Sequence, residues 1–376
     1  MSFCNSAAAA SGPDPVKVSA FARYGAQAAS TRQRLLQFVP GLRDAGIEVE
    51  WNGLLDDDYV RALGTGEKYP RGRIAGSYAR RLWNLLSQAP GDLTWIYVDL
   101  FPYFPASLES LLLGRRGPVV FDMDDAFFLQ YDDHRRPLVR TMLGGKLGQL
   151  LSRADAVTCG NPYLRDYAAQ FCERAIVVPT VVDTSHYTPR PDDSGPPLVI
   201  GWIGSSSTWP NVRPLLPLLR DLCRSGEVRF RVIGAGAGAE ADRFDGLDLV
   251  DWSEATEVAE VQRMDIGIMP LFDYPFERGK SGYKLIQYMA CGLPVVASPV
   301  GVNRDLVREG TNGFLAANAE QWSASLGMLI ADRALRRRLG AAGRMIAEES
   351  YSLSSQLPRL SALFGSVVEG RSASAE

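Results

Sequence analysis

The chain has 376 residues, 46% of them hydrophobic, which is enough for two domains that each bury their own core. Its formal net charge is −3 at pH 7, so it lacks the surplus of Lys and Arg with which a nucleic-acid-binding protein neutralises phosphates. The five cysteines include no Cys-x-x-Cys pair and no run of eighteen apolar residues occurs, so we expect neither a zinc cluster, nor a disulfide framework, nor a membrane-spanning helix.

The first dozen residues, MSFCNSAAAASG, have neither a basic start nor a sustained apolar run. They do not predict a signal peptide, and we expect a cytoplasmic protein whose cysteines are reduced. From residue 16 to about residue 183, short apolar runs alternate with longer amphipathic stretches. The apolar runs are VKVSAFA, IEVEWN, LTWIYVDL, PVVFDMDD and AVTCGN. Strands separated by helices of this length predict a parallel sheet with helices on both faces.

A cluster of Pro, Asp and Gly, TPRPDDSGPP at residues 188–197, interrupts this pattern and predicts a linker. The alternation restarts with PLVIGWIG, RFRVIGAG, LDLVDW, DIGIMPL and PVVASPV, and helices are expected at about residues 211–224 and 283–290. The sequence therefore predicts a second doubly wound domain, and ligands of such sheets bind beyond the carboxyl ends of the strands. After residue 313 the apolar spacing is helical.

Residues 275–303, PFERGKSGYKLIQYMACGLPVVASPVGVN, carry the most informative motif. Arg278, Lys280 and Lys284 flank the Ser281-Gly282 pair, where a loop is expected to enter a helix. Backbone N–H groups at a helix start, with flanking cations, form an anion site, and a diphosphate is its natural occupant. Taken alone, the same charges are equally consistent with a solvated helix start.

The segment YMACGLPVVAS resembles the donor-binding signature of the GT-B glycosyltransferases, in particular of family 4, which are mostly retaining enzymes. In that family two Glu residues, with seven residues between them, precede the segment; here these positions are Gly279 and Gln287. The resemblance implies that Gln287 hydrogen-bonds the ribose of a nucleotide-sugar donor without the charge of a carboxylate. It leaves contacts with the donor sugar to neighbours such as Glu277 or to backbone amides.

The segment IGWIGSSSTWPN, residues 200–211, predicts a second phosphate contact. Gly204 lets the backbone approach a ligand and Ser205 offers hydroxyl and amide donors, although such a segment also caps helices. Family members usually carry an Arg and a Lys shortly after this strand. No cation occurs here before Arg213, so the sequence favours Lys280 and Lys284 as replacements.

Trp252 lies in the stretch VDWSEATEVAE, residues 250–260, which in the resembling family passes the nucleotide base. We expect its ring either to form part of the wall around the nucleotide base or to pack in the core. The predicted donor-binding residues are Gly204, Ser205, Trp252, Arg278, Lys280, Ser281, Gly282, Tyr283, Lys284 and Gln287.

The run VVFDMDDAFF places Asp122, Asp124 and Asp125 at the end of an expected buried strand, where family members often carry a residue that faces the donor sugar. Buried carboxylates are unfavourable unless they are hydrogen-bonded or functional. We assign Asp124 or Asp125, together with Lys280, to the reaction centre. The alternative is that Asp122 and Asp124 form the Asp-x-Asp pair with which single-domain glycosyltransferases hold a divalent cation. We expect no metal.

The loop after the first strand contains Gly25, Ser30 and Arg32 and resembles the acceptor-side loop of related transferases. Arg32 is expected either to bind an acceptor phosphate or to be a solvated first-turn residue. The segment KYPRGRIAGSYARRLWNLL, residues 68–86, interleaves basic and aromatic residues. This composition suits an anionic membrane surface, where a lipid-linked acceptor is found, and equally suits an exposed charged helix.

The resemblance therefore implies an α/β protein of GT-B fold, with two Rossmann-like domains facing each other across a cleft. The expected parts are an acceptor domain at residues 1–187, a donor domain at 188–350, and at 351–376 a helix that crosses back to the first domain, followed by a disordered tail. The expected reaction passes a sugar from a nucleoside diphosphate sugar to a hydroxyl of a sugar or lipid-linked acceptor, in bacterial cell-surface polysaccharide or glycolipid assembly. We expect no cofactor, no nucleic-acid partner, and a place in the cytoplasm or at the inner face of the membrane. The alternatives are a nucleotide-sugar epimerase on the same fold and a non-catalytic nucleotide-sugar-binding subunit.

Overall fold

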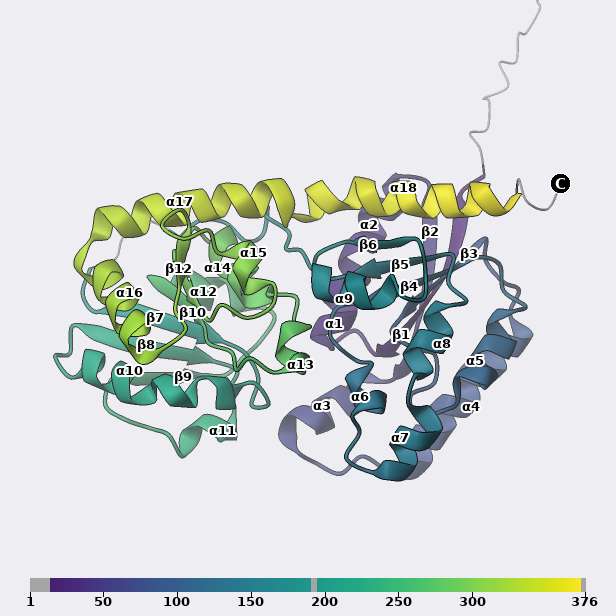
Figure 1. Ribbon diagram of the computed structural model, residues 1–376, viewed down its shortest axis with the longest axis horizontal. Helices are drawn as coiled ribbons and strands as arrows, with labels where there is room; N and C mark the ends of the chain where they lie inside the picture. The colour runs from purple at the N-terminus through teal and green to yellow at the C-terminus, as the bar shows by residue number, and fades with distance from the viewer. Residues whose placement is uncertain (1–13, 191–194, 373–376) are drawn as a thin grey trace, which may run out of the picture.

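Two parallel six-stranded sheets form the frame of the molecule (Figure 1). The computed structural model describes residues 14–190 and 195–372. The first sheet has the spatial order β2-β1-β3-β4-β5-β6 and the second the order β12-β11-β10-β7-β8-β9. The strands of the first sheet are β1 (Val16–Tyr24), β2 (Ile47–Leu55), β3 (Leu93–Tyr97), β4 (Val119–Met123), β5 (Ala156–Cys159) and β6 (Ala175–Val177). Those of the second are β7 (Leu198–Ile203), β8 (Val228–Ile233), β9 (Leu247–Val250), β10 (Ile266–Met269), β11 (Val295–Ala297) and β12 (Gly313–Leu315).

Helices connect the strands and cover the sheets. In the N-terminal domain they are α1 (Ala29–Arg34), η1 (Leu36–Phe38), α2 (Val39–Asp44), α3 (Asp57–Thr65), α4 (Arg71–Ser87), α5 (Ala106–Leu113), α6 (Leu129–Asp132), α7 (Pro137–Leu143), α8 (Lys146–Leu151) and α9 (Pro162–Ala168), where η marks a 3₁₀ helix. In the C-terminal half they are η2 (Trp209–Asn211), η3 (Arg213–Leu215), α10 (Leu216–Cys223), α11 (Ala237–Glu240), α12 (Glu257–Gln262), α13 (Pro275–Arg278), α14 (Tyr283–Ala290), α15 (Asn303–Leu306), α16 (Ala319–Ala331), α17 (Arg333–Ser350) and α18 (Leu353–Ser372). The prediction of an α/β protein with two doubly wound domains is confirmed.

Both sheets reverse their strand order beside their first strand. β1 lies between β2 and β3, and β7 lies between β8 and β10. At such a reversal the connections leave toward opposite faces, and a crevice opens beyond the carboxyl ends of the strands. Central strands such as β4 and β10 are buried at every residue, because helices cover both faces of a parallel sheet.

Prolines divide the helix that the sequence predicts at residues 211–224. The chain forms η2 and η3 first, and α10 begins only at Leu216. Pro214 and Pro217 lie at the starts of η3 and α10, because a proline has no N–H to donate and its ring clashes with a preceding helical turn. The helix predicted at residues 283–290 is present as α14.

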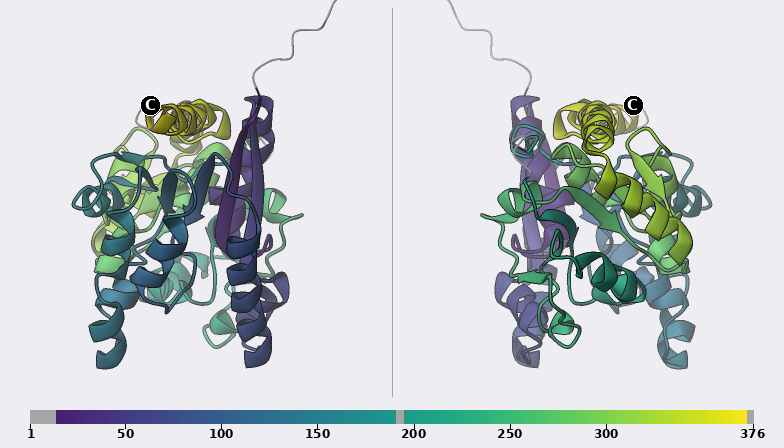
Figure 2. Two further views of the ribbon diagram at one scale, coloured as in Figure 1. Left: turned by 90° about the vertical axis from the view of Figure 1, so that its right-hand side faces the viewer. Right: turned by 90° about the vertical axis from the view of Figure 1, so that its left-hand side faces the viewer.

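The last two helices run along one side of both domains (Figures 1 and 2). α17 packs on α14 of the C-terminal domain, and α18 packs on α2 and β3 of the N-terminal domain. Between them Val182, in the segment that joins the domains, donates to Tyr351 O at 3.1 Å and accepts from Leu353 N at 2.9 Å. Phe364 of α18 is fully buried, with its ring centroid 5.1 Å from that of Trp95. Within the described ranges, no helix is both long enough and apolar enough to cross a membrane.

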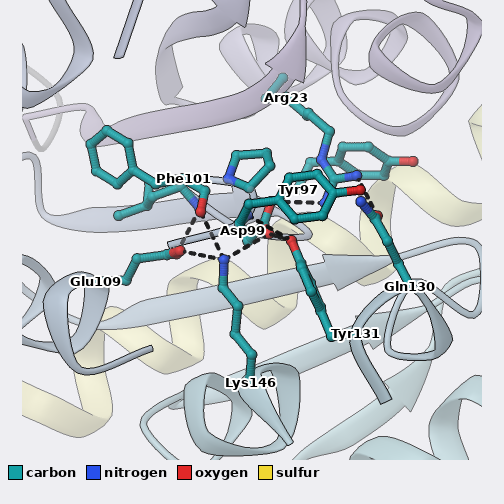
Figure 3. A network of polar contacts seen from close by, with 12 residues as sticks. Arg23, Tyr97, Asp99, Phe101, Glu109, Gln130, Tyr131 and Lys146 are labelled. Carbon is teal, nitrogen blue, oxygen red and sulfur yellow. Dashed lines mark hydrogen bonds and ion pairs between the residues drawn. The ribbon is translucent and has the colours of Figure 1, made fainter. Parts of the chain in front are cut away.

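A buried charge network lies beneath the loop that follows β3 (Figure 3). Asp99 accepts hydrogen bonds from Arg23 Nη2 at 2.9 Å, Tyr131 OH at 2.6 Å and Lys146 Nζ at 3.0 Å. Lys146 Nζ also lies 2.8 Å from Glu109 Oε1. Burial opposes ionisation of Asp99, but the charges of Arg23 and Lys146 lower its pKa to about 2. Burial, with the charge of Asp99, raises the pKa of Glu109 to about 7.

This network supports a strained stretch of backbone. Val98 has φ 70° and Tyr103 has φ 64°, a left-handed conformation that residues with a Cβ rarely adopt. Glu109 Oε2 accepts from Leu100 N at 2.8 Å, and Tyr131 OH accepts from Tyr103 N at 3.4 Å. Hydrogen bonds from the backbone N–H groups of the loop to these side chains thus hold it in a conformation that its own residues disfavour.

Candidate active site

A cavity of about 660 Å³ lies between the carboxyl ends of the two sheets. We call it the interdomain cavity, because both domains supply its wall. The N-terminal side includes Tyr24, Ser30, Arg32, Val60, Leu63, Asp124 and Asp125. The C-terminal side includes Gly204, Ser205, Trp252, Glu257, Lys280, Ser281, Gly282, Tyr283, Lys284 and Gln287. The fold therefore gathers into one cavity residues that lie far apart in the sequence.

The lysine loop, residues 279–282, is fixed by both domains. Gly282 precedes α14 with φ 71°, a left-handed conformation that glycine adopts without strain. From the N-terminal domain, Asn161 Nδ2 donates to Gly279 O at 2.8 Å and to Lys280 O at 2.9 Å. These hydrogen bonds hold the segment from which Lys280 lines the cavity. Lys284, in the first turn of α14, lines the cavity beside it.

Gly279 stands where the resembling family carries its first Glu. A Cβ at this position would lie 2.6 Å from Ala126 Cβ and 2.7 Å from Ala126 N, closer than van der Waals contact allows. The loop after β4 therefore occupies the space that a side chain would need. Asp125, from that same loop, lines the cavity beside it.

Asp125 and Lys284 have pKa values displaced toward neutrality. Burial raises the pKa of Asp125 to about 7, although the charge of Lys280 opposes the rise. Burial, together with the neighbouring charge of Lys280, lowers the pKa of Lys284 to about 8. Acids and bases shifted in this way within a cavity are typical of sites that bind anions or move protons.

The three aspartates after β4 have different partners. Arg34 binds both carboxylate oxygens of Asp122, with Nη2 2.6 Å from Oδ1 and Nε 2.9 Å from Oδ2. The carboxylate of Asp124 accepts from the Tyr97 hydroxyl at 2.5 Å, and its burial raises its pKa. Because Arg34 occupies both oxygens of Asp122, the geometry does not favour an Asp-x-Asp metal pair. Over residues 14–190 and 195–372, no group of three or more His, Cys, Asp or Glu side chains is arranged to hold a metal ion.

Gly204 allows the loop after β7 to lie against the lysines. A Cβ at Gly204 would lie 2.9 Å from Lys284 Cε and 2.4 Å from the Trp202 ring. Ser205 begins a tight turn, in which its N–H donates to Thr208 Oγ1 at 3.1 Å. The segment therefore both forms a capped turn and lines the cavity.

Trp252 is 38% exposed and lies at the cavity wall, not in the core. The guanidinium carbon of Arg32 lies 5.1 Å from the centre of its ring. Arg32 Nε also lies 3.5 Å from the carboxylate of Glu254. Arg32, which the sequence predicts on the acceptor side, thus contacts the C-terminal domain across the cavity.

Gln287 is 2% exposed and directs its amide nitrogen at two partners. Gln287 Nε2 donates to Glu257 Oε1 and to the Tyr187 hydroxyl, both at 2.9 Å. Glu257, the first residue of α12, lines the cavity and is absent from the residues that the sequence predicts. Its sequence signals are its place in the stretch 250–260, which the resemblance puts beside the nucleotide base, and an acid at a helix start, a feature that many helices share.

Other predicted residues lie apart from the cavity wall. Arg278 Nε donates to Asp273 at 2.6 Å on the surface, and Gly25 packs against Asp57. In the basic segment, Arg81 is 1% exposed and donates at 2.7 Å to backbone carbonyls of β1 and of β2. Arg81 is therefore a core residue and does not face a membrane surface.

Cys4 lies outside the described residues, and the other four cysteines are buried and form no disulfide.

Comparison with known families matches residues 197–332 to the model of Glycosyl transferases group 1. The D-inositol 3-phosphate glycosyltransferase of Stackebrandtia nassauensis is 26% identical over 240 residues, which are 54% of this chain and 51% of that protein. The protein of the same description from Xylanimonas cellulosilytica is 34% identical over 98 residues, 26% of this chain and 20% of that protein. The chain thus spans about half, or less, of the length of these curated relatives.

Solved structures share the whole architecture. Sucrose-phosphate synthase from Thermosynechococcus elongatus superposes with a TM-score of 0.71 at 14% identity, covering 94% of this chain and 100% of that one. Anabaena HepE in complex with UDP gives a TM-score of 0.68 at 16% identity, with 93% and 100% covered. The fold is therefore that of the GT-B glycosyltransferases, which confirms the resemblance seen in the sequence. Within this fold, the match to the model of Glycosyl transferases group 1 lies in the C-terminal domain, at residues 197–332.

Proposed function

We propose that this protein transfers a sugar from a nucleoside diphosphate sugar to a hydroxyl group of an acceptor. The observation that carries the proposal is the meeting of Lys280 and Lys284 from one domain with Asp124 and Asp125 from the other in one cavity. The group 1 domain supports a sugar-transfer reaction. Anabaena HepE, which shares the fold, has been solved with UDP and with UDP-glucose, which supports a nucleotide-sugar donor.

In this reaction the bond between the anomeric carbon and the diphosphate oxygen breaks, and the bonding electrons leave with the diphosphate. Lys280, Lys284 and the first N–H groups of α14 stabilise the developing negative charge. The anomeric carbon forms its new bond to the acceptor oxygen, and the proton of the acceptor hydroxyl passes to the carboxylate of Asp125. Asp125 accepts a hydrogen bond from that hydroxyl, and Asp124, held by Tyr97, positions the loop. Retention of configuration is proposed from family likeness alone.

The direct test has two stages. Thermal unfolding with UDP, ADP, GDP and their sugars identifies the donor, because a ligand that binds only the folded state raises the apparent stability. Release of nucleoside diphosphate is then measured with and without sugar acceptors. Acceptor-dependent release with a glycosylated product supports the proposal. Conversion of the nucleotide sugar without acceptor would instead support an epimerase, and binding without turnover would support a non-catalytic subunit.

We further propose that no metal takes part, since the two lysines supply positive charge beside the diphosphate. Transfer activity should then be unchanged in excess chelator. Complete loss of activity, restored by manganese or magnesium, would contradict this part of the proposal.

We also propose that the acceptor belongs to bacterial cell-surface polysaccharide or glycolipid assembly and that the protein works at the cytoplasmic face of the membrane. The support is the outer face of α4, where Leu82, Trp83 and Leu86 are 37%, 70% and 56% exposed. Arg71 and Arg80 are exposed on the same helix, and exposed apolar residues beside cations are typical of helices at anionic membranes. Wild-type protein should sediment with phosphatidylglycerol vesicles, and the Trp83→Ser and Leu86→Ser double variant should remain in the supernatant. Equal behaviour of the two proteins would contradict the membrane contact.

A further inference from the structure

One carboxylate at the cavity wall is held by residues from several separate parts of the chain. Glu257 Oε1 accepts from Gln287 Nε2 at 2.9 Å and from the hydroxyl of Tyr187. Glu257 Oε2 accepts from the indole N–H of Trp252. Tyr187 lies in the segment that joins the domains, Trp252 follows β9, Glu257 starts α12 and Gln287 is in α14. The fold therefore gives this carboxylate a defined position and orientation.

Glu257 retains capacity to bind a ligand. A carboxylate has about four acceptor sites, of which Tyr187, Gln287 and Trp252 fill three. The side chain is only half-buried and lines the interdomain cavity. A carboxylate that keeps a free acceptor site and lines a cavity suits a group that accepts a hydrogen bond from a bound molecule.

The position of this acceptor along the cavity indicates what it binds. Gln287, its partner, follows Lys284 by three residues on α14, which is about 4.5 Å along a helix axis. The cavity thus has a cationic end, at Lys280 and Lys284, next to an acceptor end, at Glu257. A carboxylate repels phosphate but accepts hydrogen bonds from hydroxyls. A nucleoside diphosphate has this order of groups: the diphosphate, followed directly by a ribose with two neighbouring hydroxyls.

We propose that Glu257 binds the ribose hydroxyls of the nucleoside diphosphate, and that Gln287 and Tyr187 are positioning residues that orient its carboxylate. The inference rests on the proposed function, in which a nucleoside diphosphate occupies the interdomain cavity. It also accounts for an amide at position 287. A carboxylate there would lie against Glu257 Oε1 and repel it, whereas the amide N–H donates to it.

The test compares two ligands by calorimetry: whichever of UDP, ADP and GDP binds most tightly, and the 2′,3′-dideoxy form of the same nucleotide. Wild-type protein should bind the ribose form about 10- to 100-fold more tightly, the range expected of a hydrogen bond to a charged group. Glu257→Gln should reduce this ratio to within about twofold. Glu260→Gln is the matched control, because Glu260 is on the same helix but pairs with Arg231 and Arg263; it should keep the wild-type ratio.

An exchange of the two side chains tests the positioning role. Gln287→Glu alone should weaken binding of the ribose form, because two carboxylates then adjoin. The double variant Glu257→Gln with Gln287→Glu should recover at least part of the preference for ribose over dideoxyribose, since it again pairs one acid with one amide.

A wild-type ratio near one, or a folded Glu257→Gln protein with the wild-type ratio, would overturn the inference while leaving the nucleotide site in place. If Glu257→Gln does not fold, the inference is judged from the wild-type ratio and from the double variant Glu257→Gln with Gln287→Glu. If no nucleoside diphosphate binds the wild-type protein at all, the proposed function itself fails, and this inference fails with it.

Discussion

The two lysines of the cavity have different surroundings. Lys280 Nζ lies over the Phe276 ring at 4.8 Å, whereas Lys284 Nζ lies 5.8 Å from the centre of the Trp202 ring, near Gly204. Burial, together with the neighbouring charge of Lys280, lowers the pKa of Lys284 to about 8. A bound diphosphate would supply the missing counter-charge and keep Lys284 protonated. The charge of Lys284 therefore depends on the ligand beside it.

Replacing either lysine with Ala should weaken binding of the nucleoside diphosphate. Loss of one charge-assisted hydrogen bond costs about 1.5–3 kcal/mol, which is roughly a 10- to 150-fold rise in Kd. Calorimetry of Lys280→Ala and Lys284→Ala measures this directly. Lys17→Ala is the control, because Lys17 is exposed near the amino end of β1, away from the cavity wall. Wild-type affinity in both cavity variants would remove the lysines from the site.

The pH profile of kcat/KM should be bell-shaped, with limbs near pH 7 and pH 8. Asp125, whose pKa is raised by burial to about 7, becomes an acceptor only as pH rises through that value. Lys284, whose pKa is lowered by burial to about 8, loses its charge as pH rises further. Because kcat/KM reports the free enzyme, these pKa values apply to it directly.

Lys284→Arg should abolish the alkaline limb, since a guanidinium stays charged. Asp125→Asn should abolish the acid limb and most of the activity. A profile that is flat between pH 6 and pH 9 in the wild type would contradict the assignment of both groups.

At the scale of elements, the connection between α13 and α14 contains a glycine whose lack of a side chain lets the other domain pack against it. Gly279 lies against Ala126 of the N-terminal domain. Asn161, at the start of α9, donates to the carbonyls of residues 279 and 280. The lysine loop therefore takes its shape from contacts across the cleft as well as from its own sequence.

Gly279→Ala should lower the stability of the protein by about 1–3 kcal/mol, the usual effect of overpacking a close contact. It should also weaken nucleotide binding, because displacement of the loop moves Lys280. Denaturant unfolding measures the first effect and calorimetry the second. Gly327→Ala in α16 is the control: no atom lies within 4 Å of its added Cβ, so the change should be neutral or stabilising. A Gly279→Ala protein as stable as wild type would show that the loop is not confined by Ala126.

At the scale of the whole molecule, the last two helices and a contact across the cavity join the domains, in addition to the connecting segment and the lysine loop. α18 lies on the N-terminal domain while α17 lies on the C-terminal domain, as Figures 1 and 2 show. Across the cavity, Arg32 stacks on Trp252 and faces Glu254. The first connection is apolar and buried, whereas Glu254 is 71% exposed, so solvent screens the second.

Phe364→Ala should destabilise the N-terminal domain by about 3–5 kcal/mol, because it leaves a cavity against Trp95 in the core. Urea unfolding monitored by tryptophan fluorescence measures the change. Glu369→Ala, at an exposed position of the same helix, should change stability by less than about 0.5 kcal/mol. A loss below about 1 kcal/mol for Phe364→Ala would show that α18 does not belong to the core of that domain.

The sequence by itself determined the features that depend on local pattern. The alternation of apolar and amphipathic runs predicted both doubly wound sheets, and the helix expected at about residues 283–290 is present as α14. Strand and helix periods, and the conformational freedom of glycine, operate over a few residues, and so they can be recognised without the fold. The segment YMACGLPVVAS belongs to the same class of information.

Only the tertiary structure decided which side chains meet. Asp122 and Asp125 look alike in sequence, yet one is neutralised by Arg34, 88 residues away, and the other lines the cavity. The pairing of Glu257 with Gln287 depends on the fold bringing the first residue of α12 to α14. The lack of a side chain at position 279 depends on the approach of Ala126 from the other domain. Packing within each domain sets the first two contacts and the approach of the two domains sets the third. Each joins residues whose separation along the chain exceeds the range of any local pattern.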